Sequence, residues 1–243
     1  MNKNVEPRAT PSGVPRDSPA GTITALELFL RSALARPLPG PDAQRRFAPV
    51  PAHDGWAPEL RPAGARHAAA LILIHPGPEG PSIPLTVRRA DLPHHPGQVS
   101  LPGGALDPGE RADAAALREA HEEIGVPSDD VRIVGALSTV WIAVSQFLVH
   151  PYVAVTDLTP GFRAHPGEVA SLFDVTVDEL CDRQRLKWAR RERNAAHVAF
   201  PYFDIRSHVV WGATAMMLGE FVCLFDREYG PGRPPEETDT QTT

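Results

Sequence analysis

The chain has 243 residues, 42% of them hydrophobic, which is enough to bury one sizeable core. A formal net charge of −6 disfavours a nucleic-acid-binding protein, because such proteins usually present a basic patch or stripe. With only two cysteines, Cys181 and Cys223, neither a disulfide framework nor a cysteine metal cluster is available, and buried free thiols in a reducing cytoplasm are expected.

The two ends of the chain are predicted to be disordered tails, at residues 1–21 and 229–243. The first of these stretches contains four prolines and no apolar segment of the kind found in a secretory signal. No run of about 18 apolar residues occurs anywhere in the sequence. We therefore expect a soluble, cytoplasmic protein without a membrane partner.

Residues 22–65 are predicted to form an N-terminal helix followed by a proline-rich extension. Apolar side chains recur at helical spacing over residues 23–35, which indicates an amphipathic helix. Seven prolines follow over residues 36–62, so no regular element is expected there. This segment is predicted to wrap over the domain in an extended form rather than to fold separately.

Residues 66–228 carry the pattern of one α/β domain. The apolar run at 67–75 indicates a buried strand, and further strands are expected at 83–90, 98–104, 131–137, 148–155, 168–175 and 198–205. The hydrophobic period changes from two to about 3.6 within residues 104–126, and a closing helix is expected at 212–225. Together these elements predict a mixed β-sheet flanked by helices on both faces.

The segment GALDPGERADAAALREAHEEIGV, residues 104–126, concentrates carboxylates on a helix. Because each helical residue turns by about 100°, Glu119, Glu122 and Glu123 share one face. Gly125 stands where a helix commonly ends in a left-handed residue. The opposite face carries the apolar stripe that should meet the core, namely Leu117, Ala120 and Ile124.

Such clustering of like charges costs stability unless a cation collects there, and Arg118 offsets only part of the repulsion. Ligands that supply only oxygen atoms select hard cations such as Mg²⁺ or Mn²⁺, which also bind substrate phosphates. The residues therefore predict cation-assisted hydrolysis of a phosphoanhydride.

Residues 104–126 resemble a complete Nudix box. The fixed positions of that motif are matched by Gly104, Glu110, Arg118, Glu119, Ala120, Glu122, Glu123, Gly125 and Val126. The resemblance implies an α/β/α sandwich that hydrolyses a nucleoside diphosphate linked to another moiety. It also implies a small-molecule nucleotide substrate and a Mg²⁺ or Mn²⁺ cofactor, and homodimers are expected by analogy with the family.

The same resemblance implies roles for the box residues. Glu119, Glu122 and Glu123 would bind the metal, with the Gly104 carbonyl as a further ligand, and Arg118 and Glu110 would orient the site by pairing. Family members often take a base or an extra ligand from a loop outside the box. The candidate for that position is Glu168, and the sequence leaves the catalytic base open between Glu168, Glu122 and Glu123.

Residues 84–104 resemble the signature of the coenzyme A diphosphatase branch. The matching positions are Leu85, Thr86, Arg88, Gly97, Pro102, Gly103 and Gly104, and the departures are Pro84, Arg89, Pro93 and Leu101. Pro93 stands where that signature has an arginine, so the 3′-phosphate of coenzyme A needs other cationic partners. The predicted substrate contacts are Arg88, Arg89, His94, His95 and Gly103.

The leading prediction is hydrolysis of coenzyme A or its thioesters to 3′-phosphoadenosine 5′-phosphate and a 4′-phosphopantetheine product. Two alternatives stay open: another nucleotide diphosphate as substrate, or a non-catalytic Nudix ligand sensor. His121 is interpreted as a surface residue and Trp211 as core packing. The basic cluster at residues 183–194 is interpreted as a solvated helix or loop face, with a rim that steers anionic substrate as its rival.

Overall fold

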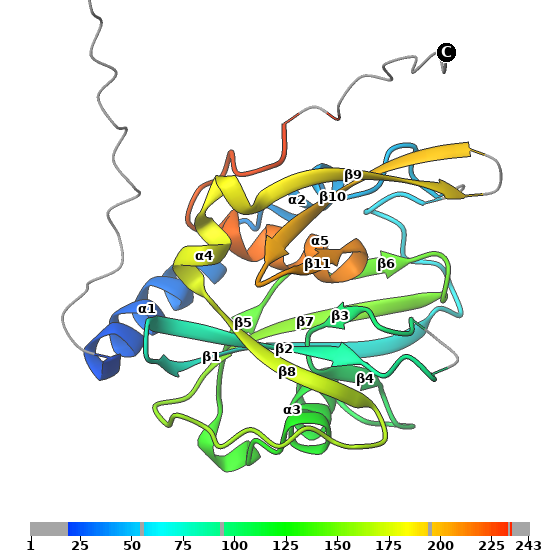
Figure 1. The fold of residues 1–243 in the computed structure, drawn as a ribbon. Coiled ribbons are helices and arrows are strands. Elements are labelled where there is room, and N and C mark those ends of the chain that lie inside the picture. Colours follow the sequence, from blue (N-terminus) through cyan, green and yellow to red (C-terminus); the bar gives the residue numbers. More distant parts are fainter. Residues whose placement is uncertain (1–18, 54–55, 93–94, 194–195, 233, 235–243) are drawn as a thin grey trace, which may run out of the picture.

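The computed structural model describes residues 19–53, 56–92, 95–193, 196–232 and 234 (Figure 1). Residues 1–18 of the first predicted tail (1–21) and residues 235–243 of the second (229–243) lie outside this part of the chain. Residues 19–21 of the first tail are not disordered as predicted, because they begin the helix α1 (Pro19–Leu34). Over the described residues, no helix is long and apolar enough to cross a membrane.

A mixed β-sheet forms the centre of the molecule, as predicted. Its path runs β3-β2-β1-β7-β5, while β4 pairs with β1, β6 with β7 and β8 with β2. The β1–β7 pairing is parallel and the others are antiparallel. The strands are β1 (Arg66–Gly77), β2 (Gly80–Arg88), β3 (Val99–Ser100), β4 (Gly103–Ala105), β5 (Arg132–Ala136), β6 (Val140–Ile142), β7 (Phe147–Val155) and β8 (Val169–Thr176).

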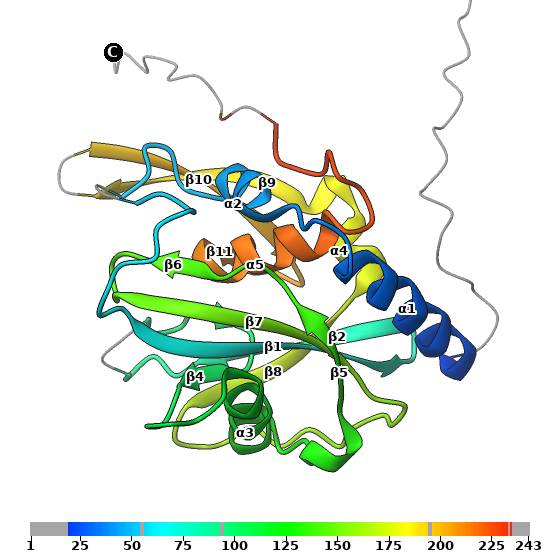
Figure 2. The same cartoon turned by 180° about the vertical axis from the view of Figure 1, so that it is seen from behind.

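Both faces of this sheet are covered, which explains why β1 reads as a continuous apolar run. Successive side chains of a strand point to opposite faces. Ala68, Ala70, Ile72 and Ile74 belong to the larger core, with α1 (Pro19–Leu34) and α5 (Gly212–Val222). Ala69, Leu71 and Leu73 pack with α3 (Ala112–Ile124) on the other face. Figures 1 and 2 show α3 on one side of the sheet and α1 and α5 on the other.

A second, three-stranded sheet lies outside α5 and was not predicted (Figure 1). It consists of β9 (Leu186–Arg193), β10 (Ala196–Ile205) and β11 (His208–Trp211), and it follows α4 (Val177–Cys181) and the short 3₁₀ helix Arg183–Arg185. The prediction of a solvated helix or loop over residues 183–194 was therefore wrong for most of that stretch. Antiparallel pairing with β10 makes it a strand despite its charge, because pairing and packing outweigh intrinsic preference.

The prediction of one strand over residues 98–104 was also wrong. The segment forms two short strands, β3 and β4, which pair with different partners, β2 and β1. Pro102 lies between them and cannot donate to a ladder, but its carbonyl accepts the Leu71 N–H at 2.9 Å. This break lets β4 pair with β1. The loop at residues 106–111 then leads to the helix α3 (Ala112–Ile124).

The proline-rich extension contains a helix, α2 (Gly40–Arg46), where no regular element was expected. Its prolines are compatible with helix because Pro39 precedes the helix and Pro41 falls in its first turn, where a missing N–H costs nothing. The fully buried carboxylate of Glu220 in α5 fixes this helix by accepting hydrogen bonds from the Gly40 N–H (3.1 Å) and the Gln44 Nε2 (3.2 Å).

Aromatic stacking joins the extension to the domain in one core. Phe47 is fully buried and stacks on Phe203 of β10, with ring centroids 5.4 Å apart, and on Tyr229 at 6.4 Å. Tyr229 is buried, so the core extends past the predicted boundary at residue 228. Of the two free cysteines, Cys223 is buried and Cys181 is partly buried.

Replacing Phe47 by alanine should lower the free energy of unfolding by about 3–5 kcal/mol, because it empties a buried aromatic site that three segments share. Leu28 of α1 is 66% exposed, and its replacement by alanine should cost less than about 0.5 kcal/mol. Urea unfolding of both variants checks this. Equal stabilities would show that the extension does not belong to the cooperative core.

Candidate active site

The segment from β4 to Val126 forms a loop, the helix α3 and the start of a second loop beside the sheet. The helix begins after Arg111, whose backbone is extended, and Asp113 lies in its first turn. It ends at Gly125, which has the predicted left-handed conformation (φ 75°) and donates its N–H to the His121 carbonyl at 2.9 Å. His121 is exposed, as predicted.

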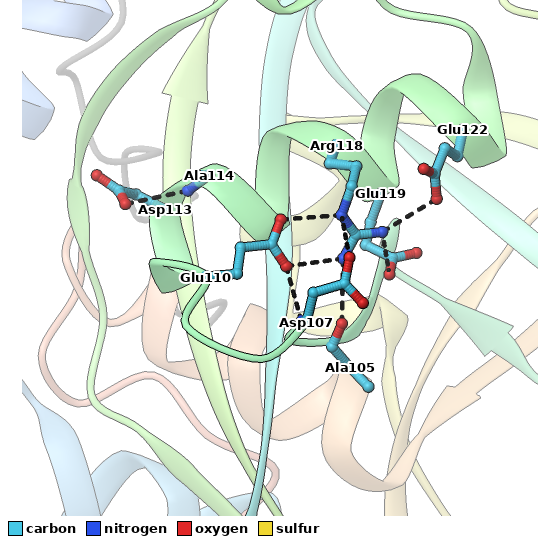
Figure 3. A network of polar contacts seen from close by, with 8 residues as sticks. All are labelled: Ala105, Asp107, Glu110, Asp113, Ala114, Arg118, Glu119 and Glu122. Carbon is cyan, nitrogen blue, oxygen red and sulfur yellow. Dashed lines mark hydrogen bonds and ion pairs between the residues drawn. The ribbon is translucent and has the colours of Figure 1, made fainter.

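A single guanidinium organises the polar side of this segment (Figure 3). Arg118 donates two hydrogen bonds to Glu110, from Nε (2.9 Å) and Nη2 (3.0 Å), which is the bidentate pairing expected between arginine and a carboxylate. Its Nη1 bonds Glu119 at 2.9 Å and Glu122 at 3.1 Å, and Nη2 bonds the Ala105 carbonyl at 3.1 Å. The hydrogen bond from Arg118 lowers the pKa of Glu110.

The three carboxylates predicted to share one helical face differ in their surroundings. The side chain of Glu122 is 54% exposed, whereas Glu123 is only 3% exposed and lies between α3 and the sheet. Burial raises the pKa of Glu123 to about 8, although the Gly103 N–H donates a hydrogen bond to it at 3.2 Å. Burial also raises the pKa of Glu119 against the opposing effect of Arg118.

The glycines of β4 allow the strand to approach its neighbours closely. A Cβ atom at Gly103 would overlap the carbonyl oxygen of Ala69 in β1. A Cβ atom at Gly104 would overlap the carboxylate of Glu119. The Gly104 backbone therefore runs directly beside a carboxylate that the sequence predicts as a metal ligand.

Glu168 lies in the loop between β7 and β8, close enough for its charge to act on Glu119 and Glu123. The loop is fastened to the end of α3, because Arg163 donates its N–H to the Ile124 carbonyl (3.0 Å) and His165 donates to the Glu123 carbonyl (2.9 Å). Glu168 itself is exposed. Besides burial, its negative charge contributes to the raised pKa values of Glu119 and Glu123.

The donor set fits a hard divalent cation in its chemistry, since it consists of carboxylate oxygens and one backbone carbonyl. Glu123 is a further reason to expect a cation, because burial disfavours the ionised carboxylate and a bound cation would stabilise it. Within the described ranges, however, no three His, Cys, Asp or Glu side chains are arranged to hold a metal ion. Arg118 bonds Oε1 of Glu119 and Oε2 of Glu122, so it leaves the second oxygen of each carboxylate for a cation.

A cleft of about 920 Å³ opens on the α5 side of the sheet. It reaches Gly103, Gly104 and Ala105 of β4, where the box begins. Its floor comes from the first residues of β1 and β7, and its roof from the start of α5. Pro49, Ala52, His53 and Trp56 of the extension add a wall, and reciprocal hydrogen bonds between Val50 and Ala199 (2.7 and 2.8 Å) hold this segment in place. Trp56 donates its Nε1–H to the Trp141 carbonyl at 2.9 Å.

The ionisable side chains that line this cleft are all basic. Among the described lining residues there is no Asp or Glu, and the ionisable ones are Arg66, Arg88, Arg191, His53 and His95. The Nε atom of Arg88 is buried and makes no hydrogen bond to any described residue. The positive charge of Arg88 acts to lower the pKa of Glu123, which places this guanidinium near the box carboxylates.

The predicted substrate contacts are only partly brought together. Arg88, His95 and Gly103 line the cleft, and His94 lies outside the described residues. The prediction for Arg89 is not supported, since its guanidinium bonds Asp91 (2.6 and 2.8 Å) and the Pro166 carbonyl (2.8 Å). A bulge in the β2–β8 pairing falls between Val87 and Arg88, and bulges re-aim the side chains around them.

Several cleft residues were missed by sequence reasoning. Trp211 was interpreted as core packing, but it is half-buried, lines the cleft and carries the Arg191 guanidinium 4.2 Å above its ring. Arg191 comes from the basic cluster, so the rival interpretation of that cluster as a substrate rim agrees better with its position. Trp56, Arg66 and Phe147 gave no signal in the sequence, because they converge only in the folded chain.

Several known proteins are similar to this chain. A family model described as NUDIX domain matches residues 65–197. Two relatives are each called "Uncharacterized Nudix hydrolase NudL". The one from Photorhabdus laumondii is 35% identical over 156 residues, covering 63% of this chain and 81% of its own. The one from Pectobacterium atrosepticum is 36% identical over 165 residues, covering 66% and 84%. The solved structure of the M. smegmatis Nudix hydrolase RenU is 30% identical, with a TM-score of 0.42, and covers 51% of this chain and 78% of that one.

Replacing Gly104 by alanine should weaken Mn²⁺ binding by about 10- to 100-fold, because the new Cβ displaces the Glu119 carboxylate. Gly161, in the loop before β8, has no atom within 4 Å of a Cβ position and serves as the control. Calorimetric titration of Mn²⁺ into both folded variants measures the effect. Unchanged affinity in the Gly104 variant would show that the Glu119 position does not contribute to the metal site.

Proposed function

The chain belongs to the Nudix family and is a Nudix hydrolase with a small-molecule nucleotide substrate, and we propose that this substrate is coenzyme A or one of its thioesters. Hydrolysis of the diphosphate would release 3′-phosphoadenosine 5′-phosphate and a 4′-phosphopantetheine product. The observation that carries the proposal is the cleft, which joins the box and is lined by three arginines and no carboxylate among the described residues.

Three features of the chain support this substrate over a simpler diphosphate. The stretch at residues 84–104 resembles the coenzyme A diphosphatase signature, and Arg88 of that signature lies in the cleft. The buried Nε of Arg88 has no hydrogen-bond acceptor in the described part of the chain, so a diphosphate oxygen would satisfy it. Most of the other lining residues are apolar, among them Leu101, Met216 and Met217, as a pantetheine or acyl chain requires.

Nudix hydrolases generally use divalent metals such as Mg²⁺ or Mn²⁺. We assign the ligands to Glu119, Glu122, Glu123 and the Gly104 carbonyl, since Arg118 bonds both Glu119 and Glu122, Gly103 donates to Glu123, and the Gly104 backbone runs beside Glu119. What such a cation supplies is neutralisation of the diphosphate charge and acidification of the attacking water.

The chain's own residues then divide the work. Arg118 positions Glu119 and Glu122 and ties down the loop through Glu110. Arg88 binds and orients the diphosphate. As the water oxygen bonds to one phosphorus, the bond from that phosphorus to the bridging oxygen breaks, and a carboxylate takes the water proton. Glu168, Glu122 and Glu123 are the candidates for that carboxylate.

Another nucleotide diphosphate is the second candidate substrate, because Pro93 replaces the arginine of the coenzyme A signature. The homodimer and the cytoplasmic location expected from the sequence stay predictions.

Turnover of a substrate panel with Mg²⁺ or Mn²⁺ tests the proposal directly. Coenzyme A, acetyl-coenzyme A, dephospho-coenzyme A, NADH, ADP-ribose, diadenosine polyphosphates and nucleoside triphosphates are compared by chromatography of their products. The proposal requires coenzyme A or its thioester to have the highest kcat/KM and to yield the bisphosphorylated adenosine. If a different diphosphate has the highest kcat/KM, only the broader hydrolase assignment stands.

Replacing Arg88 by alanine should lower kcat/KM for the best substrate by about 10- to 100-fold, as expected for the loss of a charge-assisted hydrogen bond to phosphate. Arg89→Ala removes the same charge from the next residue, whose guanidinium faces Asp91 instead. Steady-state kinetics of both variants should therefore separate them by at least about tenfold. Equal losses would contradict the assignment of Arg88 to the diphosphate.

Replacing Glu122 by glutamine should lower kcat by about 10²-fold or more, because it removes a carboxylate assigned to the metal and to proton transfer, while its shape is kept. Glu79→Gln is the control, since Glu79 lies in the exposed turn between β1 and β2. Circular dichroism confirms that both variants fold. Retained turnover in the Glu122 variant would remove this residue from the catalytic machinery.

A further inference from the structure

The cleft holds more positive charge than a diphosphate beside a divalent cation requires. The protein has a net charge of −6, yet three of its arginines line this one cleft and no described lining residue is acidic. Arg88 lies near the box carboxylates and is assigned to the diphosphate. Arg66 and Arg191 have no role in that assignment, and both come from outside the Nudix box and the coenzyme A signature.

Arg66 enters the cleft from the start of β1. It lies on the same strand face as Ala68 and Ala70, which point to the α5 side. Its parallel-strand partner is Phe147, and its guanidinium sits 4.1 Å from the centre of that ring. Ala69 pairs with Gly104, so at about 3.3 Å per residue Arg66 starts roughly 10 Å along the strand from the box.

Arg191 reaches the same cleft from the small sheet. It is exposed on β9, and its guanidinium lies 4.2 Å from the ring centre of Trp211, the last residue of β11 before α5. Each of the two guanidiniums thus rests on an aromatic face. An arginine stacked in this way keeps its N–H donors at the edge of its plane, where they can bind a phosphate.

We propose that Arg66 and Arg191 bind a phosphate monoester that the substrate carries in addition to its diphosphate. The inference rests on the proposed function, in which that group is the 3′-phosphate of the adenosine. It also accounts for Pro93: the cationic partners that the signature lacks come from β1 and β9, in other parts of the chain. Specificity for this phosphate is thereby separated from the metal site.

The test compares substrates with and without the 3′-phosphate. Arg66→Ala and Arg191→Ala should each lower kcat/KM for coenzyme A by about tenfold or more and change that for dephospho-coenzyme A by less than about threefold. Arg190→Ala is the matched control, because Arg190 is the neighbouring exposed residue on β9 and is not among the described residues that line the cleft. It should affect both substrates alike and weakly.

A binding measurement makes the result independent of which diphosphate is hydrolysed. Calorimetry without metal should show that adenosine 3′,5′-bisphosphate binds about tenfold or more tightly than adenosine 5′-monophosphate, and that both arginine variants remove this difference. If coenzyme A is not hydrolysed but this difference is found, the phosphate site stands and the proposed substrate fails. If the two nucleotides bind alike, or if the variants lose both substrates equally, the phosphate site is overturned.

Discussion

The ion pairs of Arg118 are the interaction on which the site depends. Glu110, Glu119 and Glu122 would repel one another on a short loop and helix, and the helix would gain nothing from placing them together. One guanidinium bonds all three and the Ala105 carbonyl, so it ties the loop before α3 to the helix itself. These carboxylates are consequently held in position before any cation binds, and the network is a feature of the fold as much as of the site.

The site also depends on close packing between β4 and its neighbours. Gly103 and Gly104 let the strand touch both β1 and α3, and the alanines Ala115, Ala116 and Ala120 bring the helix close to the sheet. Glu123 is buried in that narrow space, where its raised pKa reflects the cost of ionising a carboxyl away from water. The helix α3 therefore contributes its alanines to the core on one side of the sheet and its glutamates to the proposed site beside that core.

The sequence predicted the box and the central sheet well because their signals are local: strand and helix periods, a helix-ending glycine and carboxylates at helical spacing. The cleft could not be predicted in this way, since its walls come from residues 49–53, 56, 66, 141–149, 191 and 211–217, which meet only after folding. Arg88 and Arg89 illustrate the limit. They are adjacent and chemically equal, yet one lies in the cleft and the other bonds Asp91.

Charge is separated across the proposed site, which would let an acidic protein receive the polyanionic substrate that we propose. The carboxylates belong to α3, where Glu123 bonds the Gly103 N–H of β4, and the arginines line the cleft that opens at β4. A cation beside the former and a phosphate beside the latter each meet complementary charge, so neither ligand has to overcome the net negative charge of the chain. The family match begins at residue 65, whereas Pro49, Ala52, His53 and Trp56 of the cleft wall precede it. Changes in the extension would therefore alter substrate selection without touching the residues to which we assign the hydrolysis.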